Sequence, residues 1–231
     1  MNRILTTICI LLSLVATLAA VPVTASAANS PLIVENGVAV PIGTKILTTN
    51  IGTLKFTTSI GTMECTTAKM TGELTKNTTG TVESSITAVE VGGTGLKQVG
   101  APAAECTTQP IFGGDTSVTM NPTTNGLPWC LRSTSAMADD EFQLRGNSCA
   151  NLARPIRFAM DITNIGTCVY QRTGAIPGVF TTSTTDSALV LSEVEVPKLE
   201  GSFGCPSSGK LDMTVTLETD ASPSTPLGVT S

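Results

Sequence analysis

Apolar and polar residues alternate along several short stretches of this chain. Between Ile156 and Ile162 every second residue is apolar, so a strand there would place its apolar side chains on one face. The stretch from Leu211 to Leu217 alternates in the same way. The stretch from Ala188 to Val196 begins apolar and then alternates, with Glu193 and Glu195 on its polar side, as expected of a strand that leaves the core. These patterns predict half-buried β-strands.

Shorter strand patterns fill the first half of the sequence, each bounded by turn-forming residues. They cover residues 38–42, 45–49, 53–57, 63–70 and 81–91. Beyond the N-terminal segment, no stretch has the spacing of an amphipathic helix. Thr, Ser, Gly and Val are abundant while 13% of the residues are charged, a composition typical of short strands joined by tight turns. The sequence therefore predicts an all-β protein, either an antiparallel sandwich or two small sandwich-like halves.

The N-terminal residues 1–27 have the features of a signal peptide. Arg3 gives the start a positive charge, an apolar run follows, and Ala25-Ser26-Ala27 matches an A-x-A cleavage site. No later stretch is apolar enough to span a bilayer, which predicts a mature chain without a transmembrane segment. We therefore expect a secreted protein, extracellular or associated with the cell envelope. Its all-β region would cover residues 28–220, and residues 221–231 would form a flexible tail.

Two parts of the sequence resemble each other. Leu54-Lys55-Phe56 precedes a cysteine much as Ile156-Arg157-Phe158 precedes another, and a second cysteine follows each after a similar spacing. Val-rich stretches lie between the cysteines of both pairs. This pattern favours an internal duplication with related halves near residues 37–124 and 125–220, although sequence rich in Thr and Val also produces such matches by chance.

Six cysteines follow the signal peptide: Cys65, Cys106, Cys130, Cys149, Cys168 and Cys205. An even number in an exported chain predicts three disulfides. If the two halves are related, equivalent cysteines bond equivalently. The preferred scheme is then Cys65–Cys106 and Cys168–Cys205, with Cys130–Cys149 left over. A crossed arrangement, Cys65–Cys168 with Cys106–Cys205, has the same symmetry and stays open.

The chain contains no histidine, and this excludes several chemistries. Ser-His-Asp catalysis, Cys-His catalysis and histidine-ligated metals all need an imidazole. No C-x-x-C pair is present either, so the cysteines do not form the usual zinc motifs. The net charge of −5 argues against nucleic acid as a partner, because nucleic-acid binding requires clustered Lys and Arg. We predict no metal and no cofactor.

Acidic side chains are the remaining candidates for catalysis, since paired carboxylates hydrolyse glycosides. The candidates are Asp139, Asp140, Glu141, Asp161, Asp186, Glu193, Glu195 and Asp212. Most of them occupy the polar positions of amphipathic strands, which favours a solvated surface over an acid–base pair. Residues 139–141 lack the spacing of a calcium loop and predict a polar hairpin turn. No catalytic residue is therefore predicted.

Trp129 is the candidate ligand contact. It is the only Trp in the chain, and its ring could stack on a sugar, although burial beside the disulfide-forming Cys130 is the commoner outcome. A second candidate for modification is Asn77-Thr78-Thr79, a glycosylation sequon on a predicted turn.

Three further stretches carry a resemblance to other proteins. They are Gly126-Leu127-Pro128-Trp129-Cys130-Leu131, Phe142-Gln143-Leu144-Arg145-Gly146, and the residues from Gly204 to Leu211. In these stretches the chain resembles a group of exported proteins predicted from high-GC actinobacterial genomes. The similarity extends over residues 47–227. The resemblance implies export and a cysteine framework, and it brings no assigned activity and no site residue.

These patterns favour a non-catalytic protein, secreted or in the cell envelope, with a structural or adhesive role. The alternative is an extracellular module that binds a wall glycan or another surface ligand. A carboxylate-dependent glycoside hydrolase is the third hypothesis. The partner itself is unknown from the sequence.

Overall fold

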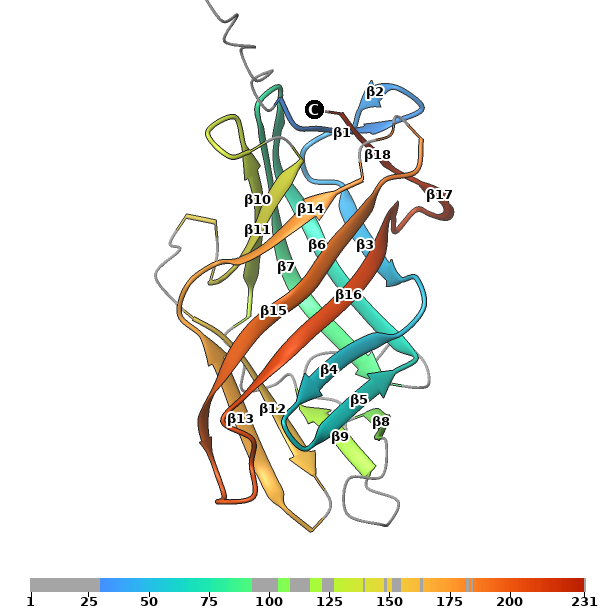
Figure 1. Cartoon of the computed structure of the whole chain (residues 1–231). Helices are drawn as coiled ribbons and strands as arrows, with labels where there is room; N and C mark the ends of the chain where they lie inside the picture. Colours follow the sequence, from blue (N-terminus) through green and yellow to red (C-terminus); the bar gives the residue numbers. More distant parts are fainter. Residues whose placement is uncertain are drawn as a thin grey trace, which may run out of the picture.

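The computed structural model describes residues 30–92, 104–108, 117–121, 127–138, 140–147, 149–150, 155–162, 164–181, 183 and 185–230. This part of the chain consists of strands joined by turns, without a helix, so it holds no helix that could cross a membrane (Figure 1). The prediction of an all-β, disulfide-bonded protein is confirmed. The predicted signal peptide, residues 1–27, lies outside the described residues.

The strands, in chain order, are β1 (Leu32–Glu35), β2 (Val38–Ala39), β3 (Lys45–Asn50), β4 (Leu54–Thr58), β5 (Gly61–Cys65), β6 (Thr67–Thr78), β7 (Thr81–Gly92), β8 (Ala104–Thr108), β9 (Ser117–Asn121), β10 (Trp129–Thr134), β11 (Glu141–Gly146), β12 (Ile156–Ile162), β13 (Gly166–Arg172), β14 (Ile176–Phe180), β15 (Ala188–Gly201), β16 (Ser208–Thr219), β17 (Ser222–Pro226) and β18 (Gly228–Thr230).

The alternating stretches of the sequence form strands as predicted. In β12 the side chains of Ile156, Phe158 and Met160 are buried, whereas Arg157 and Asp161 are exposed. A similar alternation runs along β6, β7 and β16. Because successive side chains of a strand face opposite sides, each of these strands turns one apolar face toward the core.

Eight of the strands close into a barrel. Their order is β3-β6-β7-β10-β11-β14-β15-β16, and β16 pairs back with β3. Every pairing around the barrel is antiparallel. Apolar side chains such as Leu131, Leu144 and Val215 are buried in the interior, whereas Glu73 of β6 is exposed. The barrel is thus apolar inside and polar outside.

Other strands form a second closed ring, which shares β15 and β16 with the barrel. Its order is β16-β4-β5-β8-β9-β12-β13-β15. Strand β16 pairs with β4 over residues 209–212 and with β3 over residues 215–219. It therefore belongs to the second ring at its beginning and to the barrel at its end. In Figure 1, β15 and β16 run diagonally through both parts of the molecule.

A bulge in β15 lies where the barrel and the second ring separate. The pairing of β15 with β16 shifts its register between Leu191 and Val194. Glu193 has a φ of 48°, and its backbone N–H donates a hydrogen bond of 2.6 Å to the carboxylate of Asp212. A bulge bends a strand and increases its twist. The bend accompanies the change of neighbour from β14 to β13 along β15.

The closed barrel with its extra strands corrects the prediction of a sandwich. The alternative of two small sandwich-like halves, near residues 37–124 and 125–220, is wrong as well. The barrel takes β3, β6 and β7 from one of these halves and β10, β11, β14, β15 and β16 from the other. Alternating side chains indicate which face of a strand is buried, and this pattern is the same in a sandwich and in a barrel.

The order of strand pairing in the first part of the chain recurs in the second. In the barrel, β3-β6-β7-β10 corresponds to β11-β14-β15-β16, and each set ends beside the first strand of the other. In the second ring, β4-β5-β8-β9 corresponds in the same way to β12-β13-β15-β16. Strand β15 thus takes the places of both β7 and β8, and β16 takes those of β9 and β10.

Three disulfides form in the preferred scheme. Cys65–Cys106 links β5 to β8, and Cys168–Cys205 links β13 to the turn after β15. Cys130–Cys149 joins β10 to the segment after β11. Their Cα–Cα distances of 4.6, 5.6 and 4.8 Å lie in the usual range for a disulfide. The crossed arrangement is therefore excluded.

The two ends of the described chain pair with each other at one end of the barrel (Figure 1). Strand β1 pairs with β18 and with β2, and Ile33, Leu227 and Val229 are buried in the common core. The prediction of a flexible tail over residues 221–231 is wrong for residues 222–230, which form β17 and β18. Burial of two apolar side chains gives this Ser- and Pro-rich segment a fixed place.

Candidate functional site

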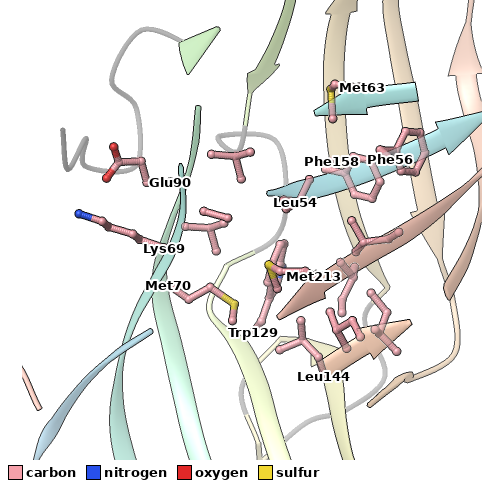
Figure 2. A pocket seen from close by; sticks show the side chains of 17 residues that line it. Leu54, Phe56, Met63, Lys69, Met70, Glu90, Trp129, Leu144, Phe158 and Met213 are labelled. Carbon is pink, nitrogen blue, oxygen red and sulfur yellow. The ribbon is translucent and has the colours of Figure 1, made fainter. Parts of the chain in front are cut away.

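An apolar cavity of about 70 Å³ lies where the barrel and the second ring meet (Figure 2). Both parts of the molecule contribute to its wall. Met70 and Trp129 come from the barrel strands β6 and β10, and Phe56 and Phe158 come from β4 and β12 of the second ring. Met213 belongs to the shared strand β16. This cavity is the candidate functional site.

The surface of the cavity is almost entirely apolar. Two charged residues lie beside it, Lys69 and Glu90, which are partners in the pairing of β6 with β7. Figure 2 shows both side chains directed away from the cavity, while their neighbours Val89 and Val91 line it. A ligand in this cavity would therefore be held by van der Waals contact and not by charge.

Glu90 is a buried acid whose burial the sequence did not predict. It is 5% exposed, and within the described part of the chain neither carboxylate oxygen has a hydrogen-bond partner. Its place between two apolar residues of β7 is typical of a solvated position on an amphipathic strand. Glu90 lies on the outer face of β7, so it supplies no charge to the cavity.

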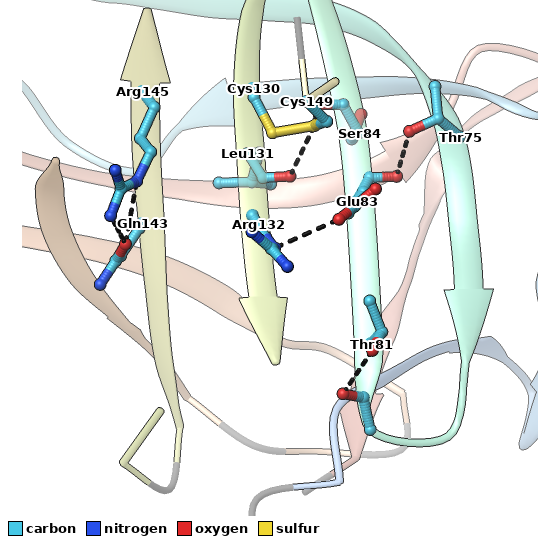
Figure 3. Close-up of polar contacts among 11 residues, drawn as sticks. Thr75, Thr81, Glu83, Ser84, Cys130, Leu131, Arg132, Gln143, Arg145 and Cys149 are labelled. Atoms are coloured by element: carbon cyan, nitrogen blue, oxygen red, sulfur yellow. Dashed lines mark hydrogen bonds and ion pairs between the residues drawn. A yellow bond between two sulfur atoms is a disulfide. The ribbon is translucent and has the colours of Figure 1, made fainter. Parts of the chain in front are cut away.

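Trp129 lies in the cavity wall and is 6% exposed. Its neighbour Cys130 faces the outside of β10, where it bonds Cys149 (Figure 3). Trp129 therefore presents no exposed ring face on which a sugar at the surface could stack. Contact between Trp129 and a ligand inside the protein stays a prediction.

Three aromatic rings pack together beside the cavity. The ring centroids of Phe56 and Phe158 are 5.4 Å apart, and the ring of Tyr170 lies 4.9 Å from Phe56 and 5.7 Å from Phe158. The hydroxyl of Tyr170 donates a hydrogen bond of 3.4 Å to the carbonyl of Pro206. Burial raises the pKa of Tyr170 to about 12, so this hydroxyl stays protonated at neutral pH. A Cβ at Gly209 would lie 2.2 Å from the Cζ atom of Phe56, which explains the glycine.

Several of the candidate carboxylates lie in separate places on the surface. Asp161 of β12 accepts a hydrogen bond from Thr167 on the neighbouring strand. Asp186 accepts one of 2.6 Å from Ser183 within a turn. Glu195 is exposed on β15. The contacts of Asp161 and Asp186 are local ones that hold a hairpin and a turn.

The bulge of β15 brings Glu193 and Asp212 together. The carboxylate of Glu193 forms an ion pair of 3.2 Å with Lys210, and Asp212 accepts the backbone N–H of Glu193. Each acid thus has a partner that stabilises the bulge. The hypothesis of a carboxylate-dependent hydrolase stays a prediction.

Asp140 and Glu141 lie at the hairpin between β10 and β11, as predicted for a polar turn, and Asp139 lies outside the described residues. The carboxylate of Glu141 accepts hydrogen bonds of 3.3 Å from the backbone of Ala138 and from the side chain of Gln143. Asp140 has a φ of 63°, a conformation common in tight turns. Among the described residues, no three His, Cys, Asp or Glu side chains are grouped as metal ligands.

Polar side chains cover the outer face of the barrel over β7, β10 and β11 (Figure 3). Arg132 forms an ion pair of 3.1 Å with Glu83 on the neighbouring strand. The guanidinium of Arg145 donates two hydrogen bonds to Gln143, of 2.7 and 3.1 Å. Such polar contacts are typical of a sheet surface, and the Arg132–Glu83 ion pair contributes about 1 kcal/mol or less.

Asn77 fixes the N-terminal strand to the barrel. Its side-chain oxygen accepts the backbone N–H of Ile33 at 2.9 Å. Its side-chain nitrogen donates to the carbonyl oxygens of Ile33 and Val40 at 2.8 and 2.9 Å. Asn77 is also buried, at 9% exposure. The interpretation of this residue as a glycosylation site is therefore wrong for the folded protein, since the nitrogen that would carry the sugar is already bonded inside it.

Phe203 is a fully exposed aromatic side chain at the tip of the hairpin between β15 and β16. The Cys168–Cys205 disulfide fastens this tip to β13. The hydroxyl of Ser202 donates a hydrogen bond of 2.7 Å to the carbonyl of Ile165 in the adjacent hairpin. The ring is therefore presented to solvent on a firmly held turn.

Comparisons of the chain with protein-family models, with curated proteins and with solved structures find no match. The candidate site is therefore interpreted from its own geometry and chemistry.

Proposed function

We propose that this protein is a non-catalytic protein of the cell exterior, secreted or held in the cell envelope, with a structural or adhesive role. The observation that carries the proposal is the double closure of the sheet. The barrel and the second ring are both closed, and the two ends of the described chain pair with each other. Closure removes the free strand edges at which sheets aggregate or unravel.

The three disulfides support the same proposal. Disulfides persist in oxidising compartments outside the cytosol. Each closes a loop of 19, 37 or 41 residues, and by the chain-entropy model each contributes about 3 to 4 kcal/mol to stability. That is comparable to a large part of the net stability of a typical domain, about 5 to 15 kcal/mol. A framework of this kind suits a protein that must stay folded outside the cell.

Phe203 is the candidate contact for the adhesive role. Aromatic side chains provide large apolar contact areas and lose little conformational entropy when they bind. The turn that carries Phe203 is fastened by the Cys168–Cys205 disulfide, so binding would not have to order it.

Fractionation of the producing cells, combined with mass mapping of the protein, tests the location and the framework. We expect a chain cleaved near Ala27, found outside the cytoplasm, with three disulfides and with protease resistance that a reductant abolishes. A cytosolic protein with free thiols would contradict the proposal.

Binding of the purified protein to envelope preparations of the same cells tests the adhesive role. We expect Phe203→Ser to lower the bound fraction several-fold. The matched control is Val179→Ser, which removes another exposed apolar side chain, on β14, and should bind as the wild type does. Equal binding by all three proteins would rule out Phe203 as the contact.

We also infer that the chain arose by internal duplication. The recurrence of the pairing order supports this inference, as does the position of Phe56 and Phe158. These two residues occupy corresponding positions in β4 and β12, and their ring centroids lie 5.4 Å apart in the buried core. Kinship with exported actinobacterial proteins is a separate proposal, which rests on the sequence stretches alone.

A further inference from the structure

The cavity lies at the fork between the barrel and the second ring, which is the place where the strands of the two parts diverge. Strands β15 and β16 continue through both parts, whereas each of the other strands in the barrel and the second ring belongs to one of them only. Leu191, at the edge of the bulge, lines the cavity, and so do Leu211 and Met213 on β16. Protein interiors contain few voids larger than a water molecule. A cavity of about 70 Å³ at this fork is therefore a consequence of the architecture.

The wall chemistry disfavours water as the natural occupant. A buried water needs about two to four polar partners, and cavities lined by aliphatic and aromatic side chains stay dry. Phe56, Trp129 and Phe158 present rings to this cavity, and its remaining surface is almost entirely carbon and sulfur. An occupant without hydrogen-bonding groups loses nothing on entering such a site.

The volume limits the size of the occupant. A cavity of about 150 Å³ accommodates benzene, and this one has about half of that volume. Met63, Met70 and Met213 stand in its wall, as Figure 2 shows. Methionine side chains are flexible and repack readily around a guest. The cavity thus suits a group of a few carbon atoms, with some room for adjustment.

We propose that this cavity is a binding site for a small hydrocarbon group, either a free apolar molecule or the last carbons of an alkyl chain. This site goes beyond the structural or adhesive role and does not depend on it. A polar or charged group at the same place is excluded from the ligand class, because the cavity offers it no partner.

Trp129 provides the measurement, since it is the only Trp in the chain and lies in the cavity wall. Bromine quenches indole fluorescence on contact. Titration of the folded protein with bromoethane, a probe smaller than benzene, should therefore give saturable quenching of Trp129. Dodecanoate brominated at its last carbon tests whether the end of an alkyl chain reaches the same place. The control is 3-bromopropionate, which carries the same bromoethyl group and a charged carboxylate, and it should give no saturable quenching.

Two variants of β6 test whether the quenching arises in the cavity. Ala68 is buried and lines the cavity, so Ala68→Leu should fill part of it and weaken bromoethane binding at least ten-fold. Thr71 lies on the opposite face of the same strand, so Thr71→Leu is the matched control and should bind like the wild type. If Ala68→Leu does not fold, Met213→Phe fills the cavity from β16 and should have the same effect.

The outcomes separate the two sources of the hydrocarbon. Saturable quenching by bromoethane alone assigns the site to free small molecules, and quenching by both probes extends it to alkyl chain ends. Quenching of the wild type that never saturates overturns the proposal. Equal binding by the wild type and a folded cavity-filling variant overturns it as well.

Discussion

The interior of the barrel and its junction with the second ring contain the same types of residue but differ in how completely they are packed. In the barrel the ring of Phe142 lies 5.0 Å from that of Phe180, and a Cβ at Gly178 would stand 2.3 Å from the Cζ atom of Phe142. At the junction, Trp129 and Met70 face a cavity of about 70 Å³. Hydrophobicity is similar in the two regions, so the arrangement of the strands decides where space remains.

Close packing recurs inside the second ring, where Phe56 lies directly against Gly209. The barrel and the second ring of strands therefore each pack a Phe side chain against a glycine on a neighbouring strand. The cavity lies between these two packed regions, at the level where β15 bulges. Side chains fill the interior of a regular barrel in layers. At the fork the strands diverge, so the side chains that they carry fill the space less completely.

The largest contrast should come from removing a side chain in each region. Phe142→Ala in the packed barrel should lower the free energy of unfolding by about 3 to 5 kcal/mol, because it leaves a new cavity. Met70→Ala at the junction should cost about 2 kcal/mol, near the lower end of the range for Met→Ala, because part of its surroundings is already open. Urea denaturation of both variants measures the difference. Equal costs would contradict the contrast in packing.

Loss of a disulfide should destabilise mainly the ring of strands that the disulfide links. The double variant Cys168→Ser with Cys205→Ser removes a link of the second ring and should cost about 3 to 4 kcal/mol. We expect amide hydrogen exchange to accelerate in β12 and β13 more than in β6 and β7. In the control, Cys130→Ser with Cys149→Ser, the barrel strand β10 should be affected instead. Uniform acceleration in both variants would show that the rings do not open separately.

Alkaline pH should weaken the second ring through Tyr170. The folded state raises the pKa of Tyr170 to about 12, above the value of about 10 that tyrosine has when exposed. Folding therefore favours the neutral hydroxyl. The stabilisation is complete below pH 10 and is lost as the pH rises toward 12.

Tyr170 is the only Tyr, so its ionisation can be followed by ultraviolet absorbance alongside the unfolding transition. Tyr170→Phe should remove this part of the alkaline loss of stability. An ionisation midpoint near 10 in the folded protein would contradict the burial of the hydroxyl.

The smallest changes in the free energy of unfolding should have opposite signs in the two regions. Ala68→Val adds methyl groups at the cavity and should stabilise the protein by about 0.5 to 1 kcal/mol. Gly178→Ala adds a single methyl group against Phe142 and should destabilise it by about 1 to 3 kcal/mol. Thermal unfolding resolves both changes. Destabilisation by both variants would mean that the junction is packed as tightly as the barrel.

Local features of the fold were predictable from the sequence. The alternation in residues 156–162 identified a half-buried strand, and the even number of cysteines together with the internal similarity favoured the three observed pairings while a crossed arrangement stayed open. Ring closure was not predictable, because it depends on which strands become neighbours. Leu227 and Val229 were missed for a related reason, since two apolar residues in a Ser- and Pro-rich segment form a pattern too short to predict a strand.

The candidate site was predictable only in part. Trp129 stood out as a rare residue, but its direction did not follow from alternation, since Trp129, Cys130 and Leu131 are all buried. The Cys130–Cys149 disulfide lies on the outer face of β10 and removes the usual difference between the two sides. The cavity itself depends on the volumes of side chains from many strands, which no local pattern contains.

Diffraction from crystals of the protein under xenon pressure tests the contrast between the two regions most directly, because xenon enters dry apolar cavities. We expect a xenon atom at the junction, in contact with Trp129, Phe158 and Met213, and none in the packed barrel beside Phe142. A junction without xenon, or xenon bound beside Phe142, would contradict the assignment of the cavity to the fork between the two rings.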